Sequence, residues 1–256
     1  MRNLLVVFIS ILGVFQASAW GPKGHDIVAY IAEQHLSRRA VRNIEAVLGD
    51  RTMVSVANWM DNASHTEDYA HTKTWHYVNV DPSEQSYNNS AKAQSGDAVT
   101  AINTIIANIA SGTLTAEQEC AELMMLIHLM GDIHCPMHAG RKSDRGGNGV
   151  AVRYFGKNTN LHSVWDSDIV ESAHRWSYGE WQQNVDRAKR REVKRLAQGT
   201  PNDWIEETLL LAHDVYDRTP RGCNISYDYV AHYTPIIEIQ FLKGGVRLAE
   251  ILERLY

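Results

Sequence analysis

The sequence predicts an all-α protein, a single compact domain of many helices with at most a small β-hairpin. Three observations support this prediction. Apolar residues recur at helical spacing along most of the chain, and capping patterns precede several of these runs. Strand-like alternation is confined to short stretches near residues 74–80 and 150–155. With 256 residues, 44% of them hydrophobic, the chain can bury one large core.

Residues 1–19 have the layout of a cleavable signal peptide. Arg2 precedes an apolar run from Leu4 to Phe15, and the small residues 17–19 follow it. The apolar run is too short to span a bilayer comfortably. We therefore expect a secreted or periplasmic protein whose mature chain begins at Trp20 and forms one domain over residues 20–256.

Charge and cysteine content exclude two classes of protein. The formal net charge is −5, and nothing resembles the basic stripe of a protein that holds nucleic acid by phosphate contacts alone. Cys120, Cys135 and Cys223 allow at most one intramolecular disulfide, so the chain is not a disulfide-stapled scaffold.

The first half of the mature chain predicts a series of helices. One follows the irregular start at residues 20–25 and carries apolar residues through Leu36. Ser37 caps a second helix, which Gly49 ends. The remaining expectations are a short helix over 54–60, a strand or extended segment over 74–80, and a helix over 97–109 that stops at Gly112.

The second half begins with an apolar helix that Thr115-Ala116-Glu117-Gln118 caps. Pro136 ends or kinks this helix. Residues 150–155 form one arm of a hairpin, and 180–197 form a charged, solvated helix. A helix starts at Thr200-Pro201, and a last helical stretch over 229–256 is interrupted at Thr234-Pro235.

The stretch from His128 to His138 is a candidate metal centre. It reads His-Leu-Met-Gly-Asp-Ile-His-Cys-Pro-Met-His, and helical spacing places His128 and Asp132 on one face. Three imidazoles and a carboxylate so close together suit a first-row metal such as zinc. The alternative is a core helix with polar residues at its end, which would leave several desolvated imidazoles in need of partners.

Further nitrogen and oxygen donors lie elsewhere in the chain. Cleavage after Ala19 would free the Trp20 amine, and a second His-x-x-x-Asp pattern occupies 162–166. A donor set without thiolate favours hydrolytic over structural zinc, and the set is too large for one ion, so we expect a cluster. The candidate ligands are Trp20, His25, Asp61, His76, His128, Asp132, His138, His162 and Asp166.

The loop over 141–149 is a candidate phosphate contact. Its glycine-rich sequence could bring backbone N–H groups and the Asn148 amide up to a phosphate. The alternative, a plain surface hairpin loop, stays open from these residues alone.

Collected in order, these motifs resemble the S1/P1 nuclease family, a trinuclear-zinc group of the phospholipase C/P1 nuclease superfamily. The resemblance covers the whole mature chain. It rests on Trp-Gly-x-x-Gly-His at 20–25, Trp-x-Asp at 59–61, Trp-His-Tyr at 75–77, His-x-x-x-Asp-x-His-x-Pro-x-His at 128–138, Gly-Gly-Asn at 146–148, His-x-x-x-Asp at 162–166 and Gly-Val-Arg-Leu-Ala at 245–249.

The resemblance implies three zinc ions per chain. One ion would be held by Asp61, His76, His128 and Asp132. A second would be held by His138, His162 and Asp166. The third would take the Trp20 amine and carbonyl with His25, and Asp132 would bridge to it. His134 matches a position that is not normally a ligand.

The implied reaction is hydrolysis of single-stranded DNA or RNA at the 3′ oxygen, giving 5′-phosphates, together with removal of phosphate from 3′-nucleotides. Asp61, Asp132 and Asn148 would be catalytic, with a zinc-bound water whose pKa is lowered to about 7. The implied substrate-binding residues are Tyr77, whose ring would stack on a base, with Asn79, Gly147 and Asn148. A monomer without stable membrane association is expected.

One position departs from the family pattern. Many members carry an arginine three residues after the ligand aspartate, where this chain has Ser64, and Lys73 is the candidate replacement. Two other interpretations stay open. One is a zinc-dependent phospholipase C of the same superfamily, whose last motif tends to end in Glu rather than in Asp166. The other is a secreted zinc-binding helical protein without activity.

Overall fold

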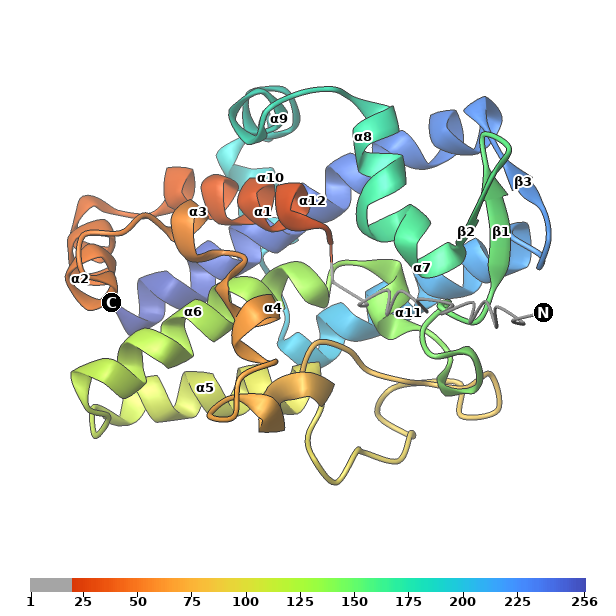
Figure 1. The fold of residues 1–256 in the computed structure, drawn as a ribbon. Helices are drawn as coiled ribbons and strands as arrows, with labels where there is room; N and C mark the ends of the chain where they lie inside the picture. The colour runs from red at the N-terminus through yellow and green to blue at the C-terminus, as the bar shows by residue number, and fades with distance from the viewer. Residues whose placement is uncertain (1–19) are drawn as a thin grey trace, which may run out of the picture.

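The computed structural model describes residues 20–256, so the predicted signal peptide at 1–19 lies outside the described residues. Helices dominate the fold, which confirms the predicted all-α class (Figure 1). The strands β1 (Ala151–Tyr154), β2 (Lys157–Asn160) and β3 (Asn224–Ile225) form a small sheet in the order β2-β1-β3. β1 and β2 are the predicted hairpin, and β3 pairs parallel to β1.

The helices of the first half are α1 (Pro22–His35), α2 (Arg38–Leu48), α3 (Met53–Val56), α4 (Trp59–Ala63), the 3-10 helix η1 (Ala70–Thr74), α5 (Ala98–Ser111) and α6 (Ala116–Asp132). The 3-10 helices η2 (Pro136–Ala139) and η3 (Lys142–Asp144) follow. The second half holds α7 (Leu161–Ser163), the π-helical turn η4 (Val164–Asp168), α8 (Ile169–Ala173), α9 (Tyr178–Val185), α10 (Arg190–Leu196), α11 (Pro201–Arg218) and α12 (Tyr227–Leu255).

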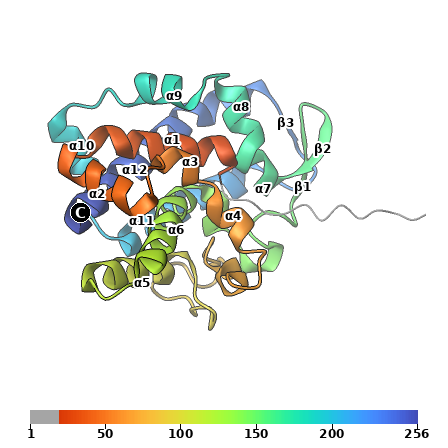
Figure 2. The ribbon, with the colours of Figure 1, turned by 60° about the vertical axis from the view of Figure 1, so that its left-hand side comes forward.

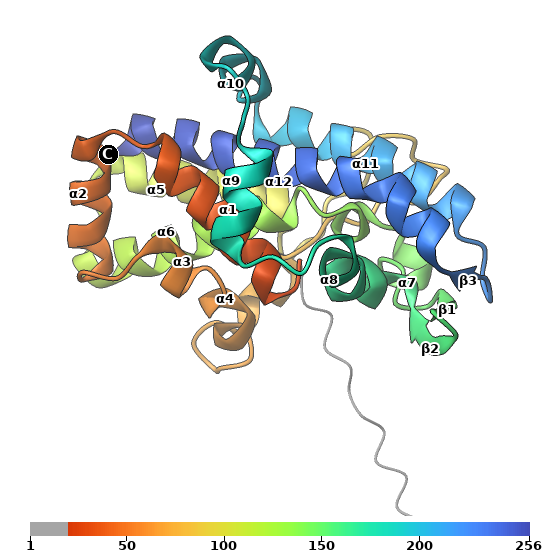
Figure 3. The same ribbon diagram turned by 90° about the horizontal axis from the view of Figure 1, so that it is seen from above.

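The core lies where α1, α6 and α12 pack together (Figure 3). Every residue of α6 from Leu123 to Asp132 is buried, so this helix passes through the interior and carries its last turn to the candidate metal centre. α1 and α12 approach each other closely at Gly245, where a Cβ would lie 2.3 Å from Ile31 Cγ2. Glycine is therefore required for this packing.

Capping residues set the helix boundaries as predicted. The Ser37 hydroxyl accepts from the Ala40 N–H (3.2 Å), and Thr115 forms a reciprocal capping box with Gln118. Gly49 and Gly112 end their helices in the left-handed region, with φ of 65° and 64°.

The predicted helix over 54–60 is wrong, because the chain forms two short helices, α3 and α4, separated at Ala57 and Asn58. The Ala57 carbonyl oxygen accepts a hydrogen bond from His128 Nδ1 at 2.8 Å. The break therefore presents a backbone acceptor to a candidate ligand, a contact that local sequence does not reveal.

The predicted helix over 180–197 is also divided, into α9 and α10. Asp186 leaves the helical conformation, with φ −88° and ψ 59°. Its carboxylate accepts hydrogen bonds from His35 Nε2 (2.9 Å) and Gln182 Nε2 (3.0 Å). Helix α9 thus ends at the residue, Asp186, that contacts His35 at the end of α1.

The last helix runs through Pro235 without the predicted interruption. Proline removes the hydrogen bond to the carbonyl four residues earlier, that of Ala231. Both Ala231 and Pro235 are exposed, so water can satisfy this carbonyl and the helix continues.

The prediction of a strand or extended segment over 74–80 is only partly correct, because Thr74 ends η1, residues 75–76 form a turn, and residues 77–80 form neither helix nor strand. The Val78 N–H donates to the His138 carbonyl (2.8 Å), and the Val80 N–H donates to the Gly140 carbonyl (3.1 Å). These two bonds hold His76 and Tyr77 beside the turn that follows α6. Within residues 20–256, no helix is long and apolar enough to cross a membrane, and all three cysteines are free.

Candidate metal centre

The predicted side-chain donors converge from five parts of the chain. They come from the first turns of α1, from α4, from the segment after η1, from the end of α6 with η2, and from α7 with η4 (Figures 1 and 2). Asp61 is half-buried, and the others are buried. So many buried ionisable groups in one place require partners or a cation.

The first group surrounds a common point beside α4 and α6. His128 Nε2 lies 3.4 Å from Asp61 Oδ1 and 3.5 Å from Asp132 Oδ2. His76 Nδ1 lies 3.1 Å from both His128 Nε2 and Asp132 Oδ2. These are the residues expected to hold one ion, and the structure brings all of them together.

The second group is formed by η2, α7 and η4. His162 Nε2 lies 3.2 Å from Asp166 Oδ2, and His138 Nε2 lies 3.9 Å from Asp166 Oδ1. Cys135 was not among the candidate ligands in the sequence analysis. Its sulfur lies within 4.8 Å of a potential ligand atom of both His138 and Asp166. Burial and the charge of Asp166 raise the pKa of this thiol well above its usual value, so Cys135 holds its proton. The sequence feature that could have placed Cys135 near the site is its position inside the His128–His138 motif.

The third group is the start of the described chain. His25 Nε2 lies 3.4 Å from Asp132 Oδ1, and the His25 ring stacks on His128 with centroids 3.9 Å apart. Trp20 is fully buried, and the next residue, Gly21, donates its N–H to the Asp166 carbonyl at 2.5 Å. Asp132 thus lies between the first and third groups, as a bridging carboxylate would.

The fit of these residues to a metal is visible in their unsatisfied atoms. Among the described residues, both ring nitrogens of His25, His76 Nε2, His138 Nε2 and Asp132 Oδ1 are buried without a hydrogen bond. Each such atom costs about 1–3 kcal/mol when left unpaired. A cation among them would remove this cost, and neutral imidazoles with carboxylates are the donors that zinc prefers.

The outward nitrogens of three candidate ligands are held by backbone carbonyls. His128 Nδ1 pairs with Ala57, His138 Nδ1 with His76, and His162 Nδ1 with Gly146 at 2.6 Å. Such contacts set the tautomer and the ring orientation of metal-binding histidines. In each ring, Nε2 is left facing the candidate centre.

The electrostatics favour cation binding. Burial lowers the pKa of His25 to about 3 and that of His138 to about 4, so both imidazoles are neutral near pH 7. Burial opposes ionisation of Asp132, but His128 and His138 lower its pKa overall. Burial raises the pKa of Asp166 to about 7. A bound cation would displace the remaining protons, which makes metal affinity depend on pH.

The glycine-rich loop positions His162. Gly146 and Gly147 have φ of 64° and 87°, and the Gly146 carbonyl is the acceptor for His162. The Gly147 N–H donates to Asp144 Oδ1 (2.7 Å), and the Asn148 amide donates to the Arg145 carbonyl (2.9 Å). The loop therefore uses these donors internally rather than holding them ready for a phosphate.

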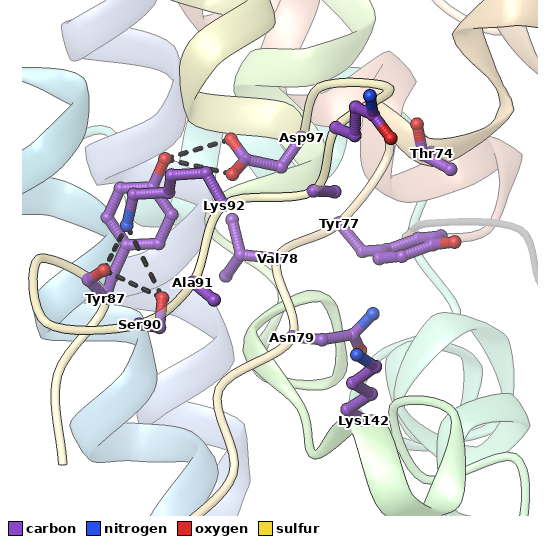
Figure 4. Close-up of a pocket in the computed structure, with 12 residues that line it drawn as sticks. Thr74, Tyr77, Val78, Asn79, Tyr87, Ser90, Ala91, Lys92, Asp97 and Lys142 are labelled. Carbon is purple, nitrogen blue, oxygen red and sulfur yellow. Dashed lines mark hydrogen bonds between the residues drawn. The ribbon is translucent and has the colours of Figure 1, made fainter. Parts of the chain in front are cut away.

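A pocket of about 300 Å³ is lined by residues that include Tyr77 and Asn79, both of which the sequence analysis expected to bind substrate (Figure 4). Lys142, which was not among the predicted substrate-binding residues, also lines this pocket and lies beside Asn79. Ser64 is buried and donates its hydroxyl to the Asp61 carbonyl (3.0 Å), so it steadies the end of α4. Lys73 is exposed on η1.

The family model described as S1/P1 Nuclease matches residues 20–256, the whole described chain. The chain belongs to the S1/P1 nuclease family. This S1/P1 family member is 30% identical to Endonuclease 4 of Arabidopsis thaliana over 271 residues, 94% of the chain and 90% of the relative. It is 31% identical to Nuclease S1 of Aspergillus oryzae over 180 residues, 68% of the chain and 62% of the relative.

Nuclease P1 of Penicillium citrinum is 25% identical over 267 residues, which cover 93% of the S1/P1 family member and 98% of the relative. Family membership and the names of these relatives support a nuclease function. The clustered histidines and aspartates are consistent with zinc in such an enzyme.

Proposed function

We propose that this S1/P1 family member is a secreted nuclease that uses three zinc ions to hydrolyse single-stranded DNA and RNA to 5′-phosphate products. We also propose 3′-nucleotidase activity. The observation that supports the proposal is the convergence of buried histidines and aspartates around Asp132, where ring nitrogens of His25, His76 and His138 have no hydrogen bond. Zinc bound there would supply Lewis acidity and activate the attacking nucleophile.

Four side chains would have different roles at the proposed zinc site. Asp61 is the donor that reaches the mouth of the site, since it is half-buried where the other donors are buried. Asp132 would hold two ions together, and Asp166 would complete the group near His162. Asn148, once its contact with Arg145 opens, would offer its amide to a phosphate oxygen.

The pocket beside Tyr77 would accept a nucleobase. Figure 4 shows the Tyr77 ring above the side chains of Asn79 and Lys142, and all three residues line this pocket. Stacking on an aromatic ring is worth about 1–3 kcal/mol per base and tolerates any base. The Lys142 ammonium would add a cation at the same opening, which suits a phosphodiester more than a neutral ligand.

The test is a substrate panel on zinc-loaded protein that begins at Trp20. We expect cleavage of single-stranded DNA and RNA, slower cleavage of duplex DNA, release of phosphate from 3′-nucleotides, and no hydrolysis of phosphatidylcholine. His128→Ala should reduce every activity at least about a hundredfold, because even the loss of a group that supports a metal ligand typically costs about 10–100-fold. His232→Ala, at an exposed histidine on α12, is the matched control and should retain activity. Hydrolysis of the phospholipid without nucleic-acid cleavage would overturn the proposal.

A further inference from the structure

A cluster of cations occupies the segment around α10. We define the basic ridge as Arg187, Lys189, Arg190, Arg191, Lys194 and Arg195, all of which are exposed. The segment 186–198 holds six basic and two acidic side chains, so the formal net charge of −5 divides into +4 here and −9 elsewhere. The chain as a whole is acidic, but this segment carries a net positive charge.

Helical spacing places the cations of α10 on one side. Arg190 and Lys194 are one turn apart, as are Arg191 and Arg195. Val193 and Leu196, away from these cations, pack partly buried against the core, and Ala197, which follows the helix, is buried. An open hollow of about 1110 Å³ lies along the charged side.

The charges of the ridge are largely uncompensated. Among the described residues, the ridge forms one ion pair, between Arg195 and Glu192 at 3.5 Å. Arg187 donates instead to neutral oxygens, those of Gln183 and Asn184. Like charges held this close repel one another, so a ligand that brings negative charge would be stabilised.

We propose that the basic ridge is a second binding surface, which holds the phosphate backbone of a nucleic-acid strand away from the metal centre. This inference rests on the proposed nuclease function for the identity of the strand. Each phosphate that a cation neutralises releases a counterion, so affinity comes without base recognition. Such a surface suits an enzyme that accepts strands of any sequence.

A strand fits the ridge better than a membrane does. Amphipathic helices that bind membranes need an apolar face free to enter the lipid. The apolar side of α10 is already packed on the core, and Arg247 Nε donates to the Leu196 carbonyl at its end (2.9 Å). The exposed side chains of α10 are all charged, whereas Val193 and Leu196 are partly buried against the core.

The ridge is separated from the metal centre. α10 projects from the body of the molecule (Figure 3), and it lies toward the opposite end from the β1–β2 hairpin (Figure 2). A mononucleotide cannot occupy both places at once, whereas a long strand can. Holding one part of a strand raises the effective concentration of the remainder at the metal centre.

Binding is measured first, independently of hydrolysis. The zinc-loaded protein is titrated into a labelled phosphorothioate 30-mer, a single strand chosen to resist cleavage, at several salt concentrations. R190Q/R191Q/K194Q/R195Q should weaken binding about tenfold or more at low salt and reduce the slope of log K against log salt by up to about 3, at roughly 0.7 per lost contact. R190K/R191K/R195K keeps every charge and should match the unmodified protein. Equal affinity and equal slope for the glutamine variant would overturn the proposal.

Kinetics then separate this inference from the proposed function. The glutamine variant should raise KM for long single-stranded DNA severalfold and leave kcat/KM for a 3′-nucleotide unchanged, because the ridge does not touch the metal centre. A protein that binds the 30-mer through the ridge but hydrolyses no substrate would refute the nuclease proposal alone. Normal KM for long DNA, with loss of binding to phosphatidylserine vesicles instead, would assign the ridge to a membrane and refute the strand proposal.

Discussion

Single residues determine how closely the candidate ligands can approach. Gly131 lies on α6 between His128 and Asp132, and a Cβ at this position would lie 2.6 Å from His25 Nδ1. His25 can approach Asp132 closely only because no side chain at residue 131 separates it from α6. This requirement concerns space rather than backbone conformation, since Gly131 lies within a regular helix.

We predict that Gly131→Ala displaces His25. Zinc content should fall by about one ion per chain, and overpacking should cost about 1–3 kcal/mol of unfolding free energy. Metal analysis and thermal unfolding of the purified variant provide the measurement. Gly179→Ala, in α9, is the matched control, because its Cβ would meet only Tyr30 Cε1 at 3.9 Å and helix propensity favours alanine. Full zinc content in Gly131→Ala would show that His25 is not a ligand.

At the scale of elements, the buried Arg247 guanidinium joins α11 to α12 and contacts His134, two residues after Asp132. Arg247 on α12 donates to both carboxylate oxygens of Glu207 on α11, at 3.0 and 2.8 Å, and contacts His134 Nε2 at 3.0 Å. The Arg247 side chain is 3% exposed and that of Glu207 is 43% exposed. His134, expected not to be a ligand, thus packs against this network.

We predict that Glu207→Gln destabilises the protein by about 1–3 kcal/mol at pH 7, less than for a fully buried pair because Glu207 is partly exposed. Burial opposes ionisation of Glu207, but Lys243 and Arg247 lower its pKa overall. Its contribution is therefore present above the unfolded pKa, about 4.3, and is lost as pH falls through the folded value. Urea unfolding should show the variants converging as pH falls below the folded-state pKa of Glu207. Glu250 is exposed on α12, so Glu250→Gln should match the unmodified protein in unfolding free energy at every pH. A loss of unfolding free energy in Glu207→Gln that grows as pH falls would contradict a stabilising role for ionised Glu207.

For the whole molecule, the start of the described chain is packed into the interior beside the candidate site. Trp20 is fully buried, and its ring packs on Phe241 with centroids 4.8 Å apart. The proposed third ion needs a free amine at this position, because an amide nitrogen has no available lone pair for a metal. Export and catalysis would thereby be coupled through cleavage after Ala19.

We predict that protein extended before Trp20 binds about one zinc fewer and hydrolyses single-stranded DNA poorly, with its helix content unchanged by far-ultraviolet circular dichroism. The comparison is made at matched concentration and saturating zinc. Proteolytic removal of the extension, leaving Trp20 first, should restore both properties and serves as the internal control. An extended form that equals the mature one in zinc content and rate would refute the N-terminal site.

Much of the fold follows from local patterns in the sequence. The caps at Ser37 and Thr115, the stops at Gly49 and Gly112, and the one-turn spacing of His128 and Asp132 depend on neighbours within a few residues. Local hydrogen bonds and the helical repeat suffice to predict such features. The candidate donors are predicted from short motifs that are weak one by one but specific when they occur together in this order.

Tertiary structure alone decided the features that depend on partners distant in the sequence. The divided helices α3–α4 and α9–α10 are accompanied by contacts from His128 and His35, and the course of α12 through Pro235 depends on exposure of one carbonyl. The place of Cys135 near Asp166 and of Lys142 near Asn79 follows from packing. The sequence by itself determined which groups could bind metal, whereas burial and long-range contacts decided which atoms meet, because those terms exist only in the folded chain.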